Sequence, residues 1–231
     1  MSENNEKIPS ERLQAVVFDF DGTLAELHID FDRMRRSIVA LAEVFLGEAP
    51  HPDGQPILEW LDILSGEIGE FDPDLGREFH TRARLTITAM ELDAARKGRV
   101  FPFAADVLGE LRRGGVKTAV ITRNCTAAVR GVFPDVKAHC DVFLARDDVP
   151  RVKPDPVHLL TALEHLGVGR EQVLMVGDHP IDISTARRAG TLSAAVASGR
   201  LSREELAAAS PDYLAGDCRE LLDMLRANGL V

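Results

Sequence analysis

Two aspartates separated by one residue follow a short apolar run near the start of the chain. Residues 13–18 (LQAVVF) lead directly into Asp19, Phe20, Asp21 and Gly22. Extended residues two apart point the same way, so Asp19 and Asp21 are expected to face one pocket. Two close carboxylates repel each other, which raises the pKa of one unless a cation lies between them. The pair suits one group as nucleophile and the other as proton donor, although Asp and Gly are also common at a simple strand-to-turn junction.

A second polar segment, Ile121-Thr122-Arg123-Asn124, also follows an apolar run. A hydroxyl at Thr122, together with the backbone amides that open the next helix, would bind phosphate oxygens. Considered alone, Thr122 or Asn124 is explained equally well as a helix cap.

The third segment is RVKPDP, residues 151–156. Pro154 keeps Lys153 extended and outside the helix that follows. Asp155 is placed as the N-cap of that helix and Pro156 as its first residue. Lys153 is thereby held at a strand edge, where it would neutralise a phosphate or an acidic neighbour; a solvated loop lysine is the simpler alternative.

The fourth segment is GDHPID, residues 177–182. Asp182 falls in the first turn of a predicted helix, where the helix dipole favours an acid, and that preference alone would explain it. Asp178 directly follows a fully apolar run and a glycine, so it calls for another explanation.

These segments place four acids, Asp19, Asp21, Asp178 and Asp182, at one predicted sheet edge with Lys153 as the opposing charge. Bare carboxylates would repel one another there. A hard divalent cation with oxygen ligands removes the repulsion, and Mg²⁺ leaves room for water and a substrate phosphate. The same cation would stabilise charge on a transferring phosphoryl group. The sequence therefore predicts Mg²⁺ as cofactor.

The elements that must position these residues alternate along the chain. Apolar runs at residues 13–18, 116–121, 142–144, 172–176 and, more weakly, 192–197 are predicted to be strands. Predicted helices lie at about residues 104–113, 126–132, 156–166, 181–189, 203–208 and 217–227. Strand alternating with helix indicates an α/β fold with a doubly wound parallel sheet, in which ligands bind at the carboxyl ends of the strands.

One interval breaks this alternation. Between Thr23 and about Arg99 no strand is predicted, and the helix-period segments 31–46, 57–68 and 73–97 indicate a small helical module inserted after the first strand. The predicted core therefore comprises residues 12–24 and 100–231, and the inserted module residues 25–99. Residues 1–11 are too polar to pack and are predicted to be a flexible tail.

Composition limits the partners. The net charge of −10 argues against nucleic acid, because binding a phosphate backbone needs a basic face. No signal segment and no apolar run long enough to span a bilayer is found, so we expect a cytoplasmic protein with no membrane partner. The three cysteines lack metal-type spacing and are expected to be reduced thiols. The sequence leaves open whether the chain is a monomer or a homodimer.

Taken in order, DFDGT, ITRN, RVKPDP and GDHPID resemble the four signature motifs of the haloacid dehalogenase-like (HAD) hydrolase superfamily. The resemblance covers residues 12–24 and 100–231, and it implies a Rossmann-like core with a helical cap at residues 25–99. The DGTL ending and the RxKPxP pattern are most similar to the phosphoglycolate phosphatase-like branch. After DGTL that branch often continues with an acid and a serine, whereas this chain reads Ala25-Glu26-Leu27-His28.

The resemblance also implies roles. Asp19 is the nucleophile, and Asp21 protonates the leaving group, then activates water, and ligates Mg²⁺ through its backbone carbonyl. Lys153 orients Asp19. The implied catalytic residues are therefore Asp19, Asp21 and Lys153. The implied phosphate-binding residues are Asp19, Gly22, Thr122, Arg123 and Lys153. The implied metal ligands are Asp19, Asp21 and Asp178, with Asp182 as their acidic support.

The predicted function is a Mg²⁺-dependent phosphatase acting on a small phosphorylated metabolite, either phosphoglycolate-like or a sugar phosphate monoester. A phosphosugar mutase or a phosphonatase on the same scaffold would share Asp19 and Asp21, whereas Asp21 argues against a dehalogenase. From other classes, a receiver-like signalling module is disfavoured because its phosphorylated Asp lies on a later strand than its acidic pair. A non-catalytic phosphate-binding module is disfavoured because all the acids needed for turnover are present.

Overall fold

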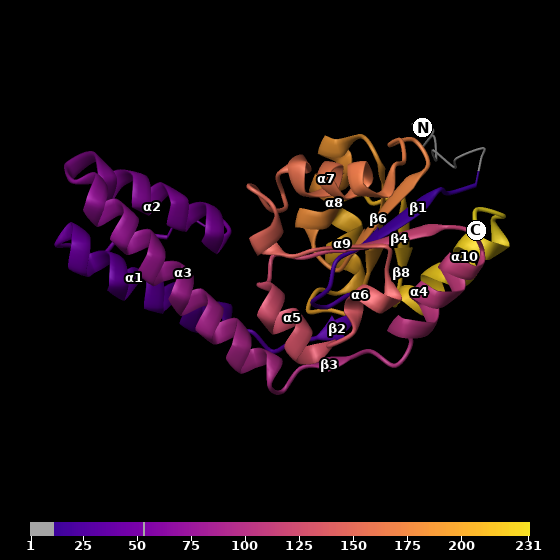
Figure 1. The fold of residues 1–231 in the computed structure, drawn as a ribbon, viewed down its shortest axis with the longest axis horizontal. Coiled ribbons are helices and arrows are strands. Elements are labelled where there is room, and N and C mark those ends of the chain that lie inside the picture. Colours follow the sequence, from indigo (N-terminus) through magenta and orange to yellow (C-terminus); the bar gives the residue numbers. More distant parts are fainter. Residues whose placement is uncertain (1–11, 53) are drawn as a thin grey trace. The chain divides into compact units, whose positions relative to one another are not determined.

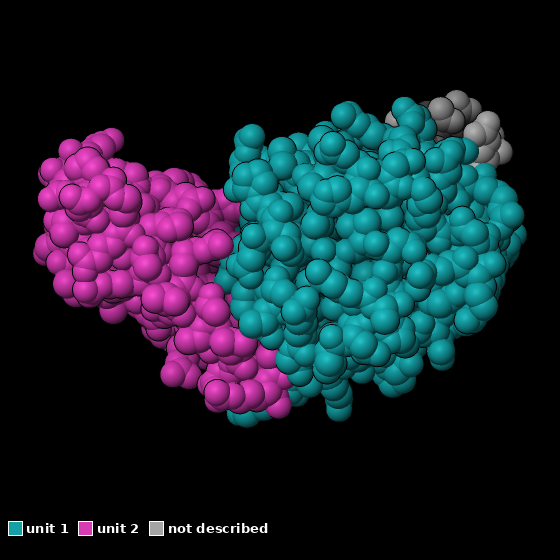
Figure 2. Space-filling model, in the orientation of Figure 1, with its two compact units in different colours: residues 1–27, 97–231 teal, residues 28–96 magenta. Residues whose placement is uncertain are grey.

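The protein is described from a computed structural model that covers residues 12–52 and 54–231. The predicted tail, residues 1–11, lies outside the described residues. The chain divides into two compact units (Figure 2): His28–Arg96 form one, and the segments that end at Leu27 and begin at Lys97 form the other. Each unit has its own buried side chains and is described separately.

The larger unit is built on a six-stranded parallel sheet with the order β5-β4-β1-β6-β7-β8 (Figure 1). The strands are β1 (Ala15–Phe18), β4 (Lys117–Ile121), β5 (Val142–Leu144), β6 (Val173–Gly177), β7 (Leu192–Val196) and β8 (Tyr213–Ala215). The α/β fold with a doubly wound parallel sheet is thus confirmed. The sequence analysis missed β8, because this edge strand is three residues long and half-exposed and so shows no apolar run.

Helices cover the sheet on its two faces (Figure 1). They are α4 (Ala104–Arg113), α5 (Thr126–Val132), α6 (Val136–His139), α7 (Pro156–Leu166), α8 (Pro180–Ala189), α9 (Arg203–Ala208) and α10 (Cys218–Ala227). Side chains of β1, β4 and β6 pack with those of α7 and α8 in one buried cluster that includes Val17, Ile121, Leu159, Met175 and Ala186. That burial fixes the central strands, and therefore the residues that follow them.

Helix α7 begins where its sequence predicts. The Asp155 carboxylate accepts a hydrogen bond from the Val157 amide at 2.9 Å, and Pro156 occupies the first helical position. The helix ends at Gly167, whose φ of 64° lies in the left-handed region. Lys153 consequently stays in the loop between β5 and α7.

The smaller unit consists of three helices, α1 (Phe31–Leu46), α2 (Ile57–Phe71) and α3 (Pro73–Ala95). Its buried face includes Ile38 of α1, Leu61 of α2 and Phe79 of α3. Helices α2 and α3 approach closely at two glycines, since a Cβ added to Gly76 would lie 2.8 Å from the Cα of Gly69. Small residues at this crossing let the two backbones come together.

The prediction that no strand lies between Thr23 and about Arg99 is wrong at both ends of that interval. Strands β2 (Ala25–Glu26) and β3 (Arg99–Val100) pair antiparallel, with Ala25 opposite Val100 and Glu26 opposite Arg99. Two-residue strands are too short to show a period of two, so the pattern could not reveal them. Both strands belong to the larger unit, and the helical unit therefore starts at His28 and stops at Arg96.

In residues 12–52 and 54–231, no helix combines the length and the apolar character that crossing a bilayer requires.

Candidate active site

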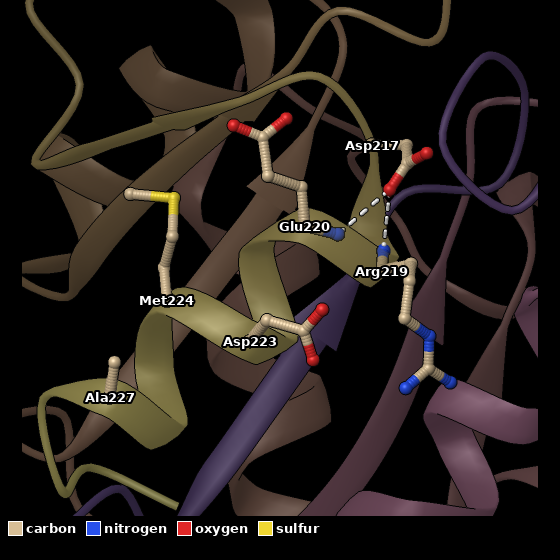
Figure 3. A pocket seen from close by; sticks show the side chains of 6 residues that line it. All are labelled: Asp217, Arg219, Glu220, Asp223, Met224 and Ala227. Carbon is tan, nitrogen blue, oxygen red and sulfur yellow. Dashed lines mark hydrogen bonds between the residues drawn. The ribbon is translucent and has the colours of Figure 1, made fainter.

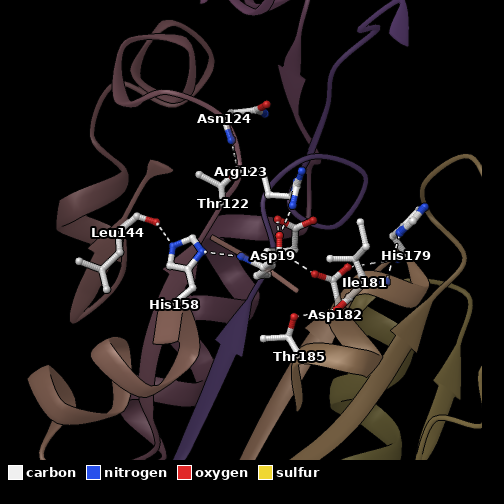
Figure 4. Close-up of polar contacts among 11 residues, drawn as sticks. Asp19, Thr122, Arg123, Asn124, Leu144, His158, His179, Ile181, Asp182 and Thr185 are labelled. Atoms are coloured by element: carbon white, nitrogen blue, oxygen red, sulfur yellow. Dashed lines mark hydrogen bonds and ion pairs between the residues drawn. The ribbon is translucent and has the colours of Figure 1, made fainter. Parts of the chain in front are cut away.

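Three of the predicted site residues directly follow adjacent strands at the same edge of the sheet. Two of them, Asp19 and Thr122, are labelled in Figure 4. Phe18 of β1 lies opposite Val120 of β4 and Val176 of β6. Asp19 comes directly after β1, Thr122 after β4 and Asp178 after β6, so parallel pairing alone brings these three segments together.

Lys153 joins two of the acids. Its Nζ lies 2.7 Å from Oδ1 of Asp19 and 2.6 Å from Oδ1 of Asp182. The lysine is 1% exposed. A lysine this buried is stable only when its charge is paired, so the two carboxylates account for its position and the solvated-loop alternative is wrong.

Both carboxylate oxygens of Asp182 make polar contacts. Oδ1 contacts Lys153, and Oδ2 accepts a hydrogen bond from the His179 amide at 3.2 Å. Its carboxylate also packs on Gly177, where an added Cβ would lie 2.2 Å from Cγ of Asp182. With both oxygens engaged, Asp182 is suited to holding Lys153 in place.

Asp19, Asp178 and Asp182 form a compact acidic cluster: one oxygen from each lies within 4.8 Å of the others. Burial, followed by the negative charges of Asp19, Asp182 and Asp21, raises the pKa of Asp178 to about 9. Burial likewise raises the pKa of Asp19 to about 6, although Lys153 acts in the opposite direction. Both carboxyl groups thus resist ionisation, chiefly because they are buried.

Lys153 keeps its proton in this setting. Burial lowers the pKa of its ammonium, but the carboxylates of Asp182 and Asp19 outweigh burial, so the pKa of Lys153 is raised. The site therefore contains one fixed positive charge among three carboxyl groups, of which Asp178, with its raised pKa, keeps its proton near pH 7 in the absence of a cation. Clustered carboxyl oxygens are the donors that a hard divalent cation prefers, and a bound cation would favour their ionised form.

Asp21 makes a different contact from Asp19. Its Oδ1 accepts a hydrogen bond from the Leu27 amide at 3.0 Å, and it is not one of the three clustered acids among the described residues. The neighbouring Gly22 has a φ of 79°, which turns the chain sharply after the aspartates. The predicted metal contact of Asp21 through its backbone carbonyl stays a prediction.

Thr122 is buried beside the cluster. Its Oγ1 accepts a hydrogen bond from the Asn124 amide at 3.2 Å, as a local turn would require. The hydroxyl hydrogen remains available for donation, because that bond uses only a lone pair of the oxygen. The Thr126 amide, which opens α5, donates to Asp147 at 3.0 Å and is already engaged.

Arg123 contacts the lysine loop. Its Nη1 donates to the backbone oxygen of Lys153, and its own backbone oxygen accepts from Nη1 of Arg146 at 3.1 Å. Arg146 is 3% exposed and comes from the segment after β5. In this structure Arg123 supports the loop that carries Lys153, and its predicted phosphate contact stays a prediction.

The sequence analysis missed His158, which is fully buried on α7. Its Nδ1 accepts from the Lys153 amide at 3.4 Å, and its Nε2 faces the backbone oxygen of Leu144 at 3.2 Å (Figure 4). Burial lowers the pKa of His158 to about 3, so the ring is neutral with its proton on Nε2. It links the lysine loop to the end of β5, and because this role depends on a carbonyl of another strand, no local pattern in the sequence indicates it.

An open hollow of about 530 Å³ lies elsewhere, along α10 (Figure 3). Its lining residues are Asp217, Arg219, Glu220, Asp223, Met224 and Ala227. None of the predicted catalytic, phosphate-binding or metal-binding residues lines it. The chemistry is therefore assigned to the edge of the sheet, where the predicted residues come together.

Comparison with known families agrees with this arrangement. The model of the haloacid dehalogenase-like hydrolases matches residues 13–190. The chain belongs to this family. The resemblance drawn from the four motifs is thereby confirmed, and the chain is a hydrolase.

Relatives cover nearly the whole chain. A "Putative pyrophosphatase PpaX" of Caldanaerobacter subterraneus is 31% identical over 223 residues, which is 93% of this chain and 96% of the relative. A phosphoglycolate phosphatase of Salmonella paratyphi A is 34% identical over 240 residues, covering 93% of each. A solved phosphonoacetaldehyde hydrolase-like protein from Oleispira antarctica shares the fold, with a TM-score of 0.65 at 16% identity, over 94% of this chain and 92% of that one.

Proposed function

We propose that this chain is a Mg²⁺-dependent phosphatase that cleaves a small phosphorylated metabolite through an aspartyl-phosphate on Asp19. The observation that carries the proposal is the position of Asp19, bound by Lys153 at 2.7 Å and clustered with Asp178 at the sheet edge. The side chain of Asp19 is 14% exposed, so it is accessible to a substrate.

In this proposal one oxygen of Asp19 attacks phosphorus while the other stays on Lys153. The bond between phosphorus and the leaving oxygen breaks, and Asp21 donates a proton to that oxygen. Asp21 then takes a proton from water, whose oxygen attacks the aspartyl-phosphate and releases inorganic phosphate and free Asp19. Asp21 is two residues from Asp19, within the same turn, so a single side chain serves both steps.

The phosphoryl oxygens are assigned to donors beside Asp19. The ammonium of Lys153 has three N–H groups, of which Asp19 and Asp182 take two. The third, together with the hydroxyl of Thr122, would bind the phosphoryl group. Asp19 and Asp178 would hold Mg²⁺, which when bound offsets negative charge on that group.

The substrate is assigned by class. The relatives named above are a phosphoglycolate phosphatase and a pyrophosphatase, which supports a small phosphate monoester or anhydride as substrate. The acidic surface supports the same choice over nucleic acid. We assign the helical unit, His28–Arg96, the role of a cap that selects among such substrates.

The proposal is tested by measuring phosphate release from a panel containing 2-phosphoglycolate, pyrophosphate, sugar phosphates and p-nitrophenyl phosphate. Asp19→Asn is expected to reduce release to background, because an amide is a poor nucleophile, and EDTA is expected to abolish turnover until Mg²⁺ is restored. Asp223→Asn on the exposed face of α10 makes the same chemical change away from the cluster and should retain activity. Wild-type turnover by Asp19→Asn would refute the assignment, and isomerised sugar phosphate without phosphate release would indicate a mutase.

A further inference from the structure

The loop at residues 197–200, after β7, reaches the turn that follows the nucleophile. The Ser198 hydroxyl donates a hydrogen bond of 2.7 Å to the backbone oxygen of Gly22. These residues are 176 positions apart in sequence. None of the four sequence motifs includes this loop.

The carboxylate of Asp178 lies between two glycines. A Cβ added to Gly22 would lie 2.2 Å from Oδ2 of Asp178, and a Cβ added to Gly199 would lie 1.8 Å from the same oxygen. Both separations are far shorter than 3.0 Å, below which a Cβ atom essentially never approaches another heavy atom. Neither position accepts a side chain while Asp178 stays where it is.

The two glycines are required for different reasons. Gly22 has a φ of 79°, so its backbone favours glycine irrespective of its neighbours. Gly199 is not among the positive-φ glycines. Its backbone is therefore one that alanine adopts freely, and the requirement for glycine comes from the Asp178 carboxylate alone.

We propose that residues 197–200 form a further segment of the active site, in which Gly199 and Ser198 position the Asp178 carboxylate for metal binding. Gly199 confines the carboxylate on one side. Ser198 holds the carbonyl of Gly22, and hence the turn that confines it on the other side. This inference rests on the proposed function, because it concerns how well Asp178 serves as a metal ligand.

The first test measures Mg²⁺ affinity directly by titration calorimetry. Gly199→Ala is expected to weaken Mg²⁺ binding by about tenfold or more, because residues that orient a metal ligand affect affinity on that scale. Ser198→Ala should cause a smaller loss. Gly109→Ala on α4 is the matched control, since an added Cβ there meets only the end of the Arg113 side chain at 3.4 Å, and it should bind Mg²⁺ like the wild type.

The second test detects the steric contact itself without using metal or activity. Gly199→Ala is expected to lower the melting temperature of the metal-free wild type but not that of an Asp178→Ala background, in which the obstructing carboxylate is gone. If Gly199→Ala alone fails to fold while the double variant folds, the same contact is demonstrated. Equal destabilisation in both backgrounds, or failure to fold in both, would overturn the inference.

The outcomes separate this inference from the proposed function. A wild type that neither binds Mg²⁺ nor needs it for turnover refutes the proposed function and the inference with it. A wild type that binds Mg²⁺ and depends on it, beside a Gly199→Ala variant with unchanged affinity, refutes the inference alone.

Discussion

At the scale of single residues, Lys153 supplies the positive charge that partly balances the acidic cluster of the candidate site. It contacts Asp19 and Asp182 at 2.7 and 2.6 Å and is almost fully buried. Truncating one partner of a buried ion pair leaves an uncompensated charge, which costs more than the pair itself contributes. The RVKPDP segment predicts a lysine held at the strand edge, and the family resemblance implies its contact with Asp19. Its shared contact with Asp182 depends on how β6 and α8 lie beside the loop.

Lys153→Met keeps the length of the side chain and removes its charge. We expect a loss of about 3–5 kcal/mol in the free energy of unfolding, because two carboxylates remain buried without their cation. We also expect phosphate release to fall to background. Urea denaturation and the phosphate assay check these expectations, with Lys137→Met on α6 as a control that should change neither. A Lys153→Met protein as stable as the wild type would show that the carboxylates are not mutually destabilising.

At the scale of elements, α7 holds the lysine loop through His158. The neutral ring accepts from the Lys153 amide and faces the backbone oxygen of Leu144, so it links the loop to the end of β5. The sequence predicts the cap and first turn of α7 from Asp155 and Pro156, because those effects are local. It does not predict the role of His158, because that role depends on a carbonyl of another strand.

His158 makes stability depend on pH in a defined window. The pKa of its imidazole is about 3 in the folded protein and about 6.5 in an unfolded chain. Between these values the unfolded state binds more protons, so the free energy of unfolding rises with pH. The stability that depends on a neutral His158 is fully present above pH 6.5 and is lost as the pH falls towards 3. Well inside this range the free energy of unfolding decreases by about 1.4 kcal/mol per pH unit.

The measurement is urea denaturation of wild type and His158→Asn at pH 7, 6 and 5. Asparagine offers an acceptor near the position of Nδ1 but does not titrate. The wild type should lose stability more steeply than the variant as pH falls, since other titrating groups are common to both. Parallel pH profiles for the two proteins would show that His158 is not held neutral by the fold.

At the scale of the whole molecule, the apolar runs predict five of the six strands of the parallel sheet and the three helices of the inserted unit. The elements that they do not predict are short or half-exposed, namely β2, β3, β8, α6 and the 3₁₀ helix Arg146–Asp148. Burial produces the sequence pattern, so segments with little burial leave little trace. The contact of Gly199 with Asp178 leaves no trace in the sequence, because nothing there distinguishes this glycine from other glycines in loops.

The helical unit leaves and re-enters the core through paired strands, since Glu26 of β2 lies opposite Arg99 of β3. Replacing residues 28–96 by a short Gly-Ser linker therefore joins two ends that are already adjacent. We expect the shortened protein to unfold cooperatively, as followed by circular dichroism, because the core retains its own buried clusters. Its discrimination among the phosphate panel should decrease. Loss of cooperative unfolding would show that the core depends on the helical unit for stability.

Mg²⁺ should stabilise the folded molecule by mass action. At a concentration 100 times its dissociation constant, a ligand bound only by the folded state adds about 2.7 kcal/mol. Asp178→Asn should remove this effect and should also raise the melting temperature of the metal-free protein near pH 7, because folding then no longer requires protonation of a carboxyl whose pKa is raised to about 9 by burial and the neighbouring acids. Thermal melts of both proteins with and without Mg²⁺ check the prediction, and an equal Mg²⁺-dependent shift in both would contradict it.

The central position of β1 also governs when activity can arise during synthesis. β1 is the first strand to be made, yet its neighbours β4 and β6 come from the middle and the later part of the chain. Contacts between residues so distant in sequence form late, after the intervening chain exists. A nascent chain that ends before β6 carries Asp19, the proposed nucleophile, and Lys153 but lacks Asp178 and Asp182, so we expect premature termination there to yield an inactive product.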